Sequence, residues 1–178
     1  MMLSASTGFA QSTTQLAQPS PFYARGNVVG TIETSYVTLL GSSTAMPSVH
    51  VGGHYFVRDS VSLGLDVSAY GVWQDGDDAV MLGLAGVLRH HFARFDRATI
   101  FADVSFGPYQ ASNRVPEDGT HFNFITRVWP GATFELNDRT QAMVAARYWH
   151  LSNARLEGQD RNPSLNGAEL SIGLLWRW

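Results

Sequence analysis

The chain has no cysteine among its 178 residues, which excludes a disulfide framework and a thiolate metal site. Charged residues are scarce, at 15% of the sequence against roughly 25% in ordinary soluble domains. The formal net charge of −3 argues against a nucleic-acid-binding protein, which would be basic. No segment reaches the ~18–20 uninterrupted apolar residues that a membrane helix needs. These absences leave a β protein that is either soluble or spans a membrane as a barrel.

Alternation of apolar and polar residues decides between these two classes. In the segment 60–70 every odd position is apolar, from Val61 to Ala69, and most even positions are polar or glycine. Four further segments show the same period of two: 99–109, 122–136, 141–152 and 168–178. A period of two puts alternate side chains on opposite faces of a strand. Runs of about ten residues exceed the average globular strand and match the length that a tilted strand needs to cross a bilayer.

We therefore predict an all-β fold, an eight-stranded antiparallel transmembrane β-barrel of the bacterial outer membrane. The expected strands are 27–40, 46–57, 60–73, 79–92, 98–109, 121–136, 140–152 and 167–178. Tight charged turns alternate with longer polar loops at 110–120 and 153–166, which is typical of an outer-membrane barrel with both termini in the periplasm.

The barrel domain is expected to comprise residues 26–178. Residues 1–10 look like the remnant of a secretory signal peptide, with small residues near Ala10. The segment 11–25 is rich in Gln, Ser, Thr and Pro and is expected to be a flexible periplasmic lead-in.

The less apolar strand faces are expected to line the barrel interior. They carry charged residues of both signs: Glu33, Asp66, Arg89, Asp103, Arg127, Glu135 and Arg147. Mixed signs predict a paired, plugged lumen rather than an open pore. The outward faces carry aromatic residues that suit a belt at the membrane interface: Tyr36, Tyr55, Trp176 and Trp178.

A histidine and a serine follow one another at i and i+2 near the end of the seventh expected strand. His150 and Ser152 therefore share one face, with backbones about 6–7 Å apart. A serine hydroxyl is a weak nucleophile unless a nearby base takes its proton, and the histidine is such a base. Because Arg147 should point inward, the pair should point outward to lipid, beside the long loop. The alternative is structural: a histidine at the membrane interface and a serine that caps the strand.

The sequence from His150 to Ala154, His-Leu-Ser-Asn-Ala, is followed by an Asn-Pro and Asn-Gly loop and a last apolar strand. This arrangement at the C-terminal end of the chain resembles the outer-membrane lipid A 3-O-deacylase family (PagL-like). The resemblance implies a Ser-His-Glu triad that hydrolyses an ester-linked acyl chain of lipid A. It implies that His150 is the base, Ser152 the nucleophile and Glu169 the acid.

A supporting set of polar groups is expected around the oxyanion. The residues concerned are Asn153, Arg155, Asn162 and Asn166. Arg155 stands where the family usually has glycine, whose backbone N–H helps to hold the oxyanion. By strand parity Glu169 should face the interior, so a bulge would have to redirect it toward the histidine. Glu157 and Asp160 in the adjoining loop are the alternative acids.

These inferences predict a serine esterase of the outer membrane with its active site toward the outer leaflet. The resemblance implies lipid A or lipopolysaccharide as substrate, with the 3-O-linked hydroxyacyl chain as the leading choice, and no cofactor. Expected partners are outer-membrane lipid and the barrel-assembly machinery, since a terminal aromatic residue resembles the assembly signal of such barrels; a homodimer is left open. The alternatives are a non-enzymatic outer-membrane barrel with a structural or adhesion role, and a soluble lipocalin-like carrier.

The other histidines do not predict a metal site. His50 and His54 share a strand face, but four residues of strand separate them by ~13 Å, too far for one ion with bonds of ~2 Å. His90 and His91 are adjacent and should point to opposite faces.

Overall fold

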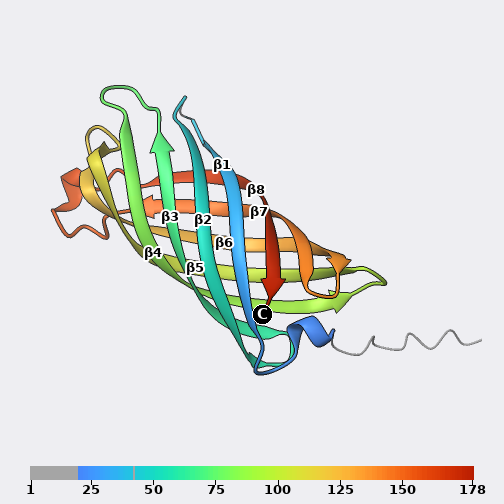
Figure 1. The fold of residues 1–178 in the computed structure, drawn as a ribbon. Coiled ribbons are helices and arrows are strands. Elements are labelled where there is room, and N and C mark those ends of the chain that lie inside the picture. The colour runs from blue at the N-terminus through green and yellow to red at the C-terminus, as the bar shows by residue number, and fades with distance from the viewer. Residues whose placement is uncertain (1–19, 42) are drawn as a thin grey trace, which may run out of the picture.

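The computed structural model describes residues 20–41 and 43–178, which form a closed antiparallel barrel of eight strands (Figure 1). The strands are β1 (Val28–Leu39), β2 (Ala45–Arg58), β3 (Val61–Val72), β4 (Ala79–Arg94), β5 (Ala98–Val115), β6 (Thr120–Asn137), β7 (Thr140–Ser152) and β8 (Leu165–Arg177). Each strand pairs with the next in sequence, and β1 closes the barrel by pairing with β8. The predicted fold class is confirmed. No helix within the described residues is long and apolar enough to cross a membrane.

The hairpin of β5 and β6 is longer than the sequence predicted. β5 continues to Val115, which pairs with Thr120 at the start of β6. The expected loop 110–120 shrinks to the four residues 116–119. Alternation fades in this hairpin because a strand that extends beyond a bilayer no longer needs one apolar face, so the pattern could not show where the strands end.

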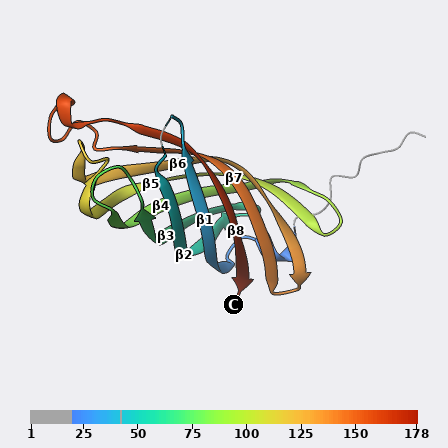
Figure 2. The same ribbon diagram turned by 90° about the horizontal axis from the view of Figure 1, so that it is seen from above.

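The two ends of the barrel differ in their connections, as Figures 1 and 2 show. The turns between β2 and β3, β4 and β5, and β6 and β7 lie at the end where the chain terminates. The longest connection, residues 153–164 between β7 and β8, lies at the opposite end and contains a short 3-10 helix, η2 (Gln159–Arg161). This division into short and long connections is the pattern of outer-membrane barrels.

The barrel interior has a charged middle layer between two apolar clusters. The middle layer contains three arginines and four carboxylates: Arg89, Arg127, Arg147, Glu33, Asp66, Asp103 and Glu169. Arg147 contacts Glu33, Asp103 and Glu169 at 2.6, 3.0 and 3.0 Å. The charged residues predicted to line the lumen are therefore buried there. Glu135 is the exception, half-buried next to an irregular register at the β6–β7 turn.

A short N-terminal segment closes one mouth of the barrel. It forms the 3-10 helix η1 (Pro21–Tyr23), whose Phe22 and Tyr23 are buried. The Tyr23 ring stacks on His91 with 3.8 Å between centroids, and its hydroxyl binds Thr133 and Gln141. This part of the predicted lead-in 11–25 is thus folded rather than flexible, because its two aromatic rings are buried in the apolar cluster at that end. Residues 1–19, with the predicted signal remnant 1–10, lie outside the described residues.

The outer surface of the barrel is apolar. On β3, Leu63, Leu65 and Val67 are more than half exposed, whereas Asp66 and Ser68 are buried in the lumen. This inverted distribution is that of a barrel whose outer face contacts lipid. The predicted aromatic residues lie on this surface: Tyr36, Tyr55 and Trp178 are exposed, and Trp176 is half-buried.

Candidate active site

Strand β7 presents a polar pair to the lipid-facing surface. Its odd-numbered residues, including Arg147 and Trp149, are buried in the lumen. Its even-numbered residues point outward: Tyr148 is exposed, and His150 and Ser152 are half-buried. The outward direction that strand parity predicts for this pair is the one the structure shows, beside the connection 153–164.

His150 is held from the neighbouring strand β8. Its direct partner across the β7–β8 ladder is Asn166, whose Oδ1 lies 2.9 Å from His150 Nδ1. An amide oxygen accepts a hydrogen bond, so Nδ1 carries the proton in this contact and Nε2 is the basic nitrogen. The hydroxyl of Tyr148 donates to the same Asn166 oxygen.

Ser152 is the last residue of β7 and has an aromatic neighbour. Its partner on β6 is Phe124, whose ring stacks on that of Phe106 with 5.3 Å between centroids. No hydrogen bond joins Ser152 and His150 within the part of the chain that the structure describes. Catalytic pairs without substrate are often more widely spaced than in the reacting complex.

Glu169 does not lie next to His150. Its side chain is fully buried in the lumen, where Oε1 contacts Arg147 at 3.0 Å and Arg127 at 3.6 Å. The parity of β8 causes this placement, because the regular ladder from Asn166 to Trp176 contains no bulge that would turn Glu169 outward. The structure therefore corrects the expectation that Glu169 reaches the imidazole.

The two alternative acids also make no hydrogen bond or ion pair with the imidazole among the described residues. Glu157 is exposed and pairs with Arg161 at 3.5 Å. Asp160 is exposed in η2. Among the described residues, neither side chain has a hydrogen bond to His150, whose Nδ1 is occupied by Asn166.

Asn153 organises the turn that follows the pair. It is buried; its side-chain amide donates to the Arg161 carbonyl and the Thr120 hydroxyl, and its Oδ1 accepts the N–H of Arg155 at 2.9 Å. Asn162 Oδ1 in turn accepts the backbone N–H of Asn153 at 2.9 Å. The Asn153 amide and the Arg155 N–H are thus already hydrogen-bonded, whereas the Asn162 amide nitrogen has no hydrogen bond among the described residues.

The turn places Arg155 in a backbone conformation that favours glycine. Ala154 and Arg155 have φ of 52° and 62°, in the left-handed region. Only glycine adopts this region without steric cost. A glycine at position 155, as the family resemblance implies, would therefore fit the observed backbone better than the arginine.

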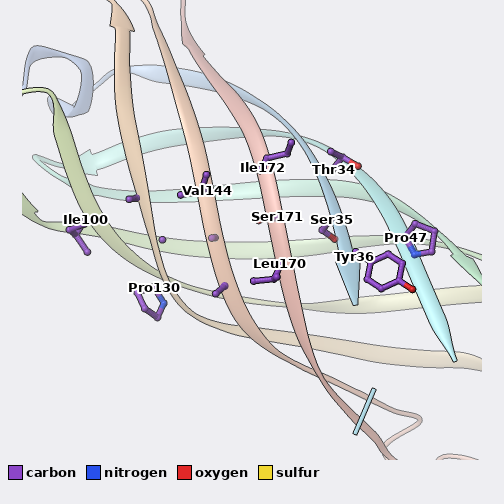
Figure 3. Close-up of a pocket in the computed structure, with 14 residues that line it drawn as sticks. Thr34, Ser35, Tyr36, Pro47, Ile100, Pro130, Val144, Leu170, Ser171 and Ile172 are labelled. Carbon is purple, nitrogen blue, oxygen red and sulfur yellow. The ribbon is translucent and has the colours of Figure 1, made fainter. Parts of the chain in front are cut away.

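An apolar groove lies on the outer surface below the pair. It has a volume of about 880 Å³ and spans β5 to β8 and on to β1 and β2 (Figure 3). Residues of this groove include Tyr36, Pro130, Val144, Ala146, Leu170 and Ile172. Ala146 shares the outward face of β7 with His150, four residues further along the same strand. The groove therefore offers an apolar surface continuous with the strand face that carries the pair.

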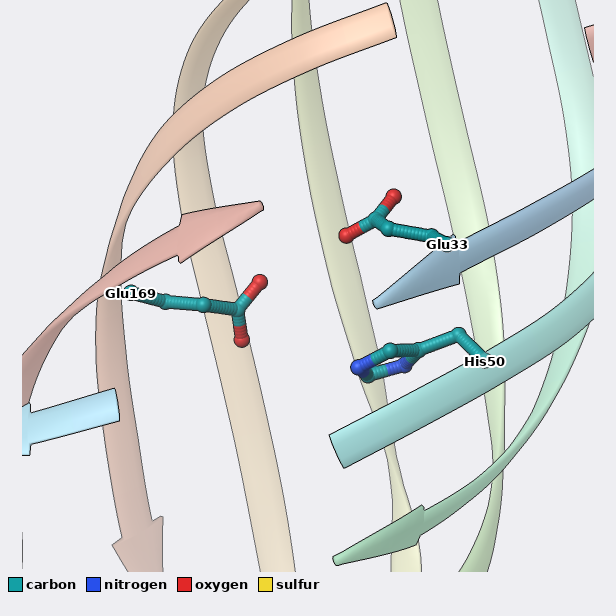
Figure 4. Close-up of side chains that lie close together, drawn as sticks. All are labelled: Glu33, His50 and Glu169. Carbon is teal, nitrogen blue, oxygen red and sulfur yellow. The ribbon is translucent and has the colours of Figure 1, made fainter. Parts of the chain in front are cut away.

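A second group of side chains, inside the lumen, has metal-ligand chemistry. Glu33, His50 and Glu169 come from three strands and point toward one another, with ligand atoms within 4.8 Å (Figure 4). Arg127 lies 3.0 Å from His50 Nδ1, and Arg147 binds both carboxylates. The guanidinium groups already supply the positive charge that a cation would bring. The sequence did not predict this group because its members are far apart along the chain.

These features define a class of protein. A closed barrel with an apolar outer band and a sealed, charged lumen is a multi-pass outer-membrane protein. A histidine–serine pair on its lipid-facing surface distinguishes it from a barrel whose outer surface is apolar throughout, since polar groups in contact with lipid are costly.

A family model for lipid A 3-O-deacylase (PagL) matches residues 40–174. The chain therefore belongs to this family, which is one of lipid A deacylases, a class of hydrolase. No sequence of a curated protein matches the chain.

Solved structures share its fold. The chain is similar to the outer membrane enzyme PagL, with 20% identity and a TM-score of 0.60 over 80% of this chain and 97% of that one. It is also similar to Neisserial surface protein A (NspA), with 13% identity and a TM-score of 0.61 over 85% and 96% of the two chains. OprG from Pseudomonas aeruginosa matches with 11% identity and a TM-score of 0.50 over 88% and 97%. At such identities these likenesses show the fold alone.

Proposed function

We propose that the protein is a serine esterase that removes an ester-linked acyl chain from lipid A in the outer leaflet, with Ser152 as nucleophile and His150 as base. The observation that carries the proposal is the shared outward face of these two residues. Lipid A places its esters at the level of the membrane interface, which a lumenal or fully water-exposed pair would not reach. Membership of the lipid A deacylase family supports this substrate class.

The reaction proceeds in two halves. His150 Nε2 takes the proton of the Ser152 hydroxyl as Oγ attacks the ester carbonyl, and a tetrahedral oxyanion forms. The bond to the sugar oxygen then breaks, and the sugar leaves as an alcohol with the proton from His150. A water molecule, deprotonated by His150, then attacks the carbonyl of the acyl-enzyme. The bond between the acyl carbon and Ser152 Oγ breaks, the fatty acid leaves, and His150 returns the proton to Ser152. No cofactor takes part in this scheme.

We take Asn162 as the candidate oxyanion donor. Its Oδ1 accepts the N–H of Asn153, the residue after Ser152, and its amide nitrogen has no hydrogen bond among the described residues. The side chain of Asn153 and the N–H of Arg155, in contrast, are already bonded within the turn. Removal of one oxyanion donor typically costs ~10²–10³ in kcat.

The apolar surroundings suit a substrate that remains in the membrane. Phe124, whose ring stacks on that of Phe106, lies opposite Ser152 on β6, and the groove on the outer surface is apolar. Hydrocarbon on these surfaces stays out of water while the ester sits at the strand end. We propose the 3-O-linked chain as the one removed, as the family description states for its members.

Mass spectrometry of lipid A tests the proposal. Bacteria that express the chain behind a secretion signal should lose one acyl chain from lipid A, and Ser152→Ala should abolish the loss while the barrel still migrates as a folded, heat-modifiable band. Ser112→Ala, at an exposed serine of β5, is the matched control and should keep activity. Intact lipid A from cells with folded wild-type protein would favour a non-enzymatic barrel instead.

Assembly offers a separate proposal. Strand β8 alternates between inward and outward residues up to Leu175, and the exposed Trp178 follows it. We propose that this aromatic-flanked strand is recognised by the barrel-assembly machinery. Trp178→Ala should then lower the amount of folded protein in the outer membrane more than Trp73→Ala, at an exposed tryptophan of the opposite end.

A further inference from the structure

The Oδ1 atom of Asn166 accepts two hydrogen bonds at the candidate active site. One comes from Nδ1 of His150 at 2.9 Å and the other from the Tyr148 hydroxyl. His150 and Asn166 are direct partners across β7 and β8. The rings of Tyr148 and His150 lie side by side, with centroids 6.4 Å apart and 13° between their planes. The three side chains therefore form one contact on the outer surface, beside Ser152.

The contact has an amide where serine hydrolases of the Ser-His-acid type have a carboxylate. In those enzymes the carboxylate keeps the proton on Nδ1 and stabilises the imidazolium that forms. An amide oxygen also keeps the proton on Nδ1, because it accepts a hydrogen bond from Nδ1–H. It stabilises the imidazolium only weakly, because it is neutral. Sites of the Cys-His-Asn type show that this arrangement supports catalysis. Glu169 cannot perform either task from its position in the lumen.

Tyr148 restricts how the amide is presented. Rotation of the Asn166 side chain by half a turn would offer its amide nitrogen to the histidine, and His150 would then have to carry its proton on Nε2. That tautomer cannot accept the proton of Ser152. A phenol hydroxyl donates more strongly than it accepts, so the contact with Tyr148 favours the orientation in which Oδ1 faces both donors.

We infer that Asn166, oriented by Tyr148, is the positioning residue of His150 and takes the place of the triad acid in this chain. The inference rests on the proposed function, since it concerns the base of the proposed reaction. It predicts that the histidine has the correct tautomer without a full negative charge beside it.

The tautomer of His150 is measured directly by ¹⁵N NMR of histidine-labelled protein in detergent micelles, with His150→Gln to assign the signals. In the wild-type protein Nδ1 should carry the proton and Nε2 should not. Asn166→Leu should give a mixture of the two histidine tautomers and lower kcat for lipid A about 10- to 100-fold. This factor lies between the cost of losing one hydrogen bond and the larger cost of a triad histidine in the wrong tautomer. KM should change little, because Asn166 does not bind the acyl chain.

Two near-isosteric substitutions separate positioning from a merely structural role. Asn166→Asp should keep the Nδ1–H tautomer and raise kcat about tenfold, because a carboxylate also stabilises the imidazolium. Tyr148→Phe should lower kcat about 3- to 10-fold in the wild-type background. It should have almost no effect in the Asn166→Asp background, because the two oxygens of a carboxylate are equivalent. Tyr55→Phe, at another exposed outward tyrosine, is the matched control.

The outcomes distinguish this inference from the proposed function. A wild-type tautomer in both Asn166→Leu and Tyr148→Phe would overturn the positioning role even if the protein deacylates lipid A. Equal losses from Tyr148→Phe in both backgrounds would overturn the role of Tyr148 in orienting the amide. A wild-type protein that leaves lipid A intact would overturn the proposed function, whereas the tautomer would still report on Asn166. If Asn166→Leu does not assemble, the two near-isosteric variants carry the test.

Discussion

Arg147 and His150 lie three residues apart on β7 and illustrate two different uses of a polar side chain. Arg147 faces the lumen and binds Glu33, Asp103, Glu169 and the Ser171 hydroxyl. His150 faces lipid and has one hydrogen-bond partner among the described residues, Asn166. A buried charge with so many partners serves the barrel itself. A polar group with a basic nitrogen left over, on an apolar surface, is costly to keep and is therefore the better candidate for chemistry.

Strand β8 repeats this contrast. Glu169 belongs to the lumenal ion network, and Asn166, three residues earlier, holds the histidine outside. Charge is thus kept inside, where arginines neutralise it, and a neutral amide is used outside, where lipid would make a carboxylate expensive. The two faces of the same strand pair meet different demands with different chemistry.

The largest effect should come from removal of the outward base. His150→Ala should lower the rate of deacylation about 10⁴-fold or more, since loss of a catalytic histidine removes the activation of the serine. The free energy of unfolding should change by less than about 0.5 kcal/mol, as for other surface positions. A time course of lipid A mass spectra measures the rate of deacylation. Urea unfolding in the presence of lipid vesicles measures the free energy of unfolding. A loss of stability as large as the loss of activity would make His150 a structural residue.

The converse experiment removes the inward charge. Arg147→Met should destabilise the barrel by about 3–5 kcal/mol, because three carboxylates lose their shared partner in a buried layer. Arg139→Met, in the exposed turn before β7, is the matched control and should cost under about 0.5 kcal/mol. Urea unfolding in the presence of lipid vesicles gives both values. Similar costs for the two substitutions would show that the lumenal network contributes little.

A charge on the apolar outer band tests which surface meets lipid. Leu65→Arg should destabilise the barrel by about 2–4 kcal/mol, the cost of arginine at the lipid-facing midplane. Leu156→Arg, in the connection after β7, makes the same chemical change at an exposed loop position and should have little effect. A spin label attached to a cysteine at position 65 should have its spectrum broadened by oxygen, which dissolves in lipid, rather than by a polar nickel reagent. Preferential access by nickel would place this face in water.

The smallest effect concerns the turn beside Ser152. Arg155→Gly should raise the free energy of unfolding by about 1 kcal/mol, because the residue has a φ of 62° and glycine adopts it without steric cost. The N–H that binds Asn153 is retained in the variant. Glu157→Gly in the same connection is the comparison, and without such a φ it should not stabilise. Denaturant midpoints of the two variants decide the matter.

The barrel and its inside–outside division could be predicted from sequence because lipid imposes a strict period of two. The same parity predicted that His150 and Ser152 face outward and that Glu169 faces inward. The contact of His150 with Asn166 could not be predicted, because it depends on the register of β7 against β8 across a connection of twelve residues, 153–164. The plug formed by Phe22 and Tyr23 was also missed, since a polar, proline-containing segment carries no periodic signal.

The outward direction of the histidine–serine pair has a kinetic consequence. Under the proposed mechanism an amphiphile reaches Ser152 by lateral diffusion within a leaflet, so its effective concentration is a surface density and not an amount per volume of solution. Added detergent would spread a fixed amount of substrate over more micellar surface and slow the reaction, even though the bulk concentrations of enzyme and substrate stay the same. Turnover should therefore follow the mole fraction of substrate in the micelle. In a membrane, the rate would rise with the local surface density of lipid A.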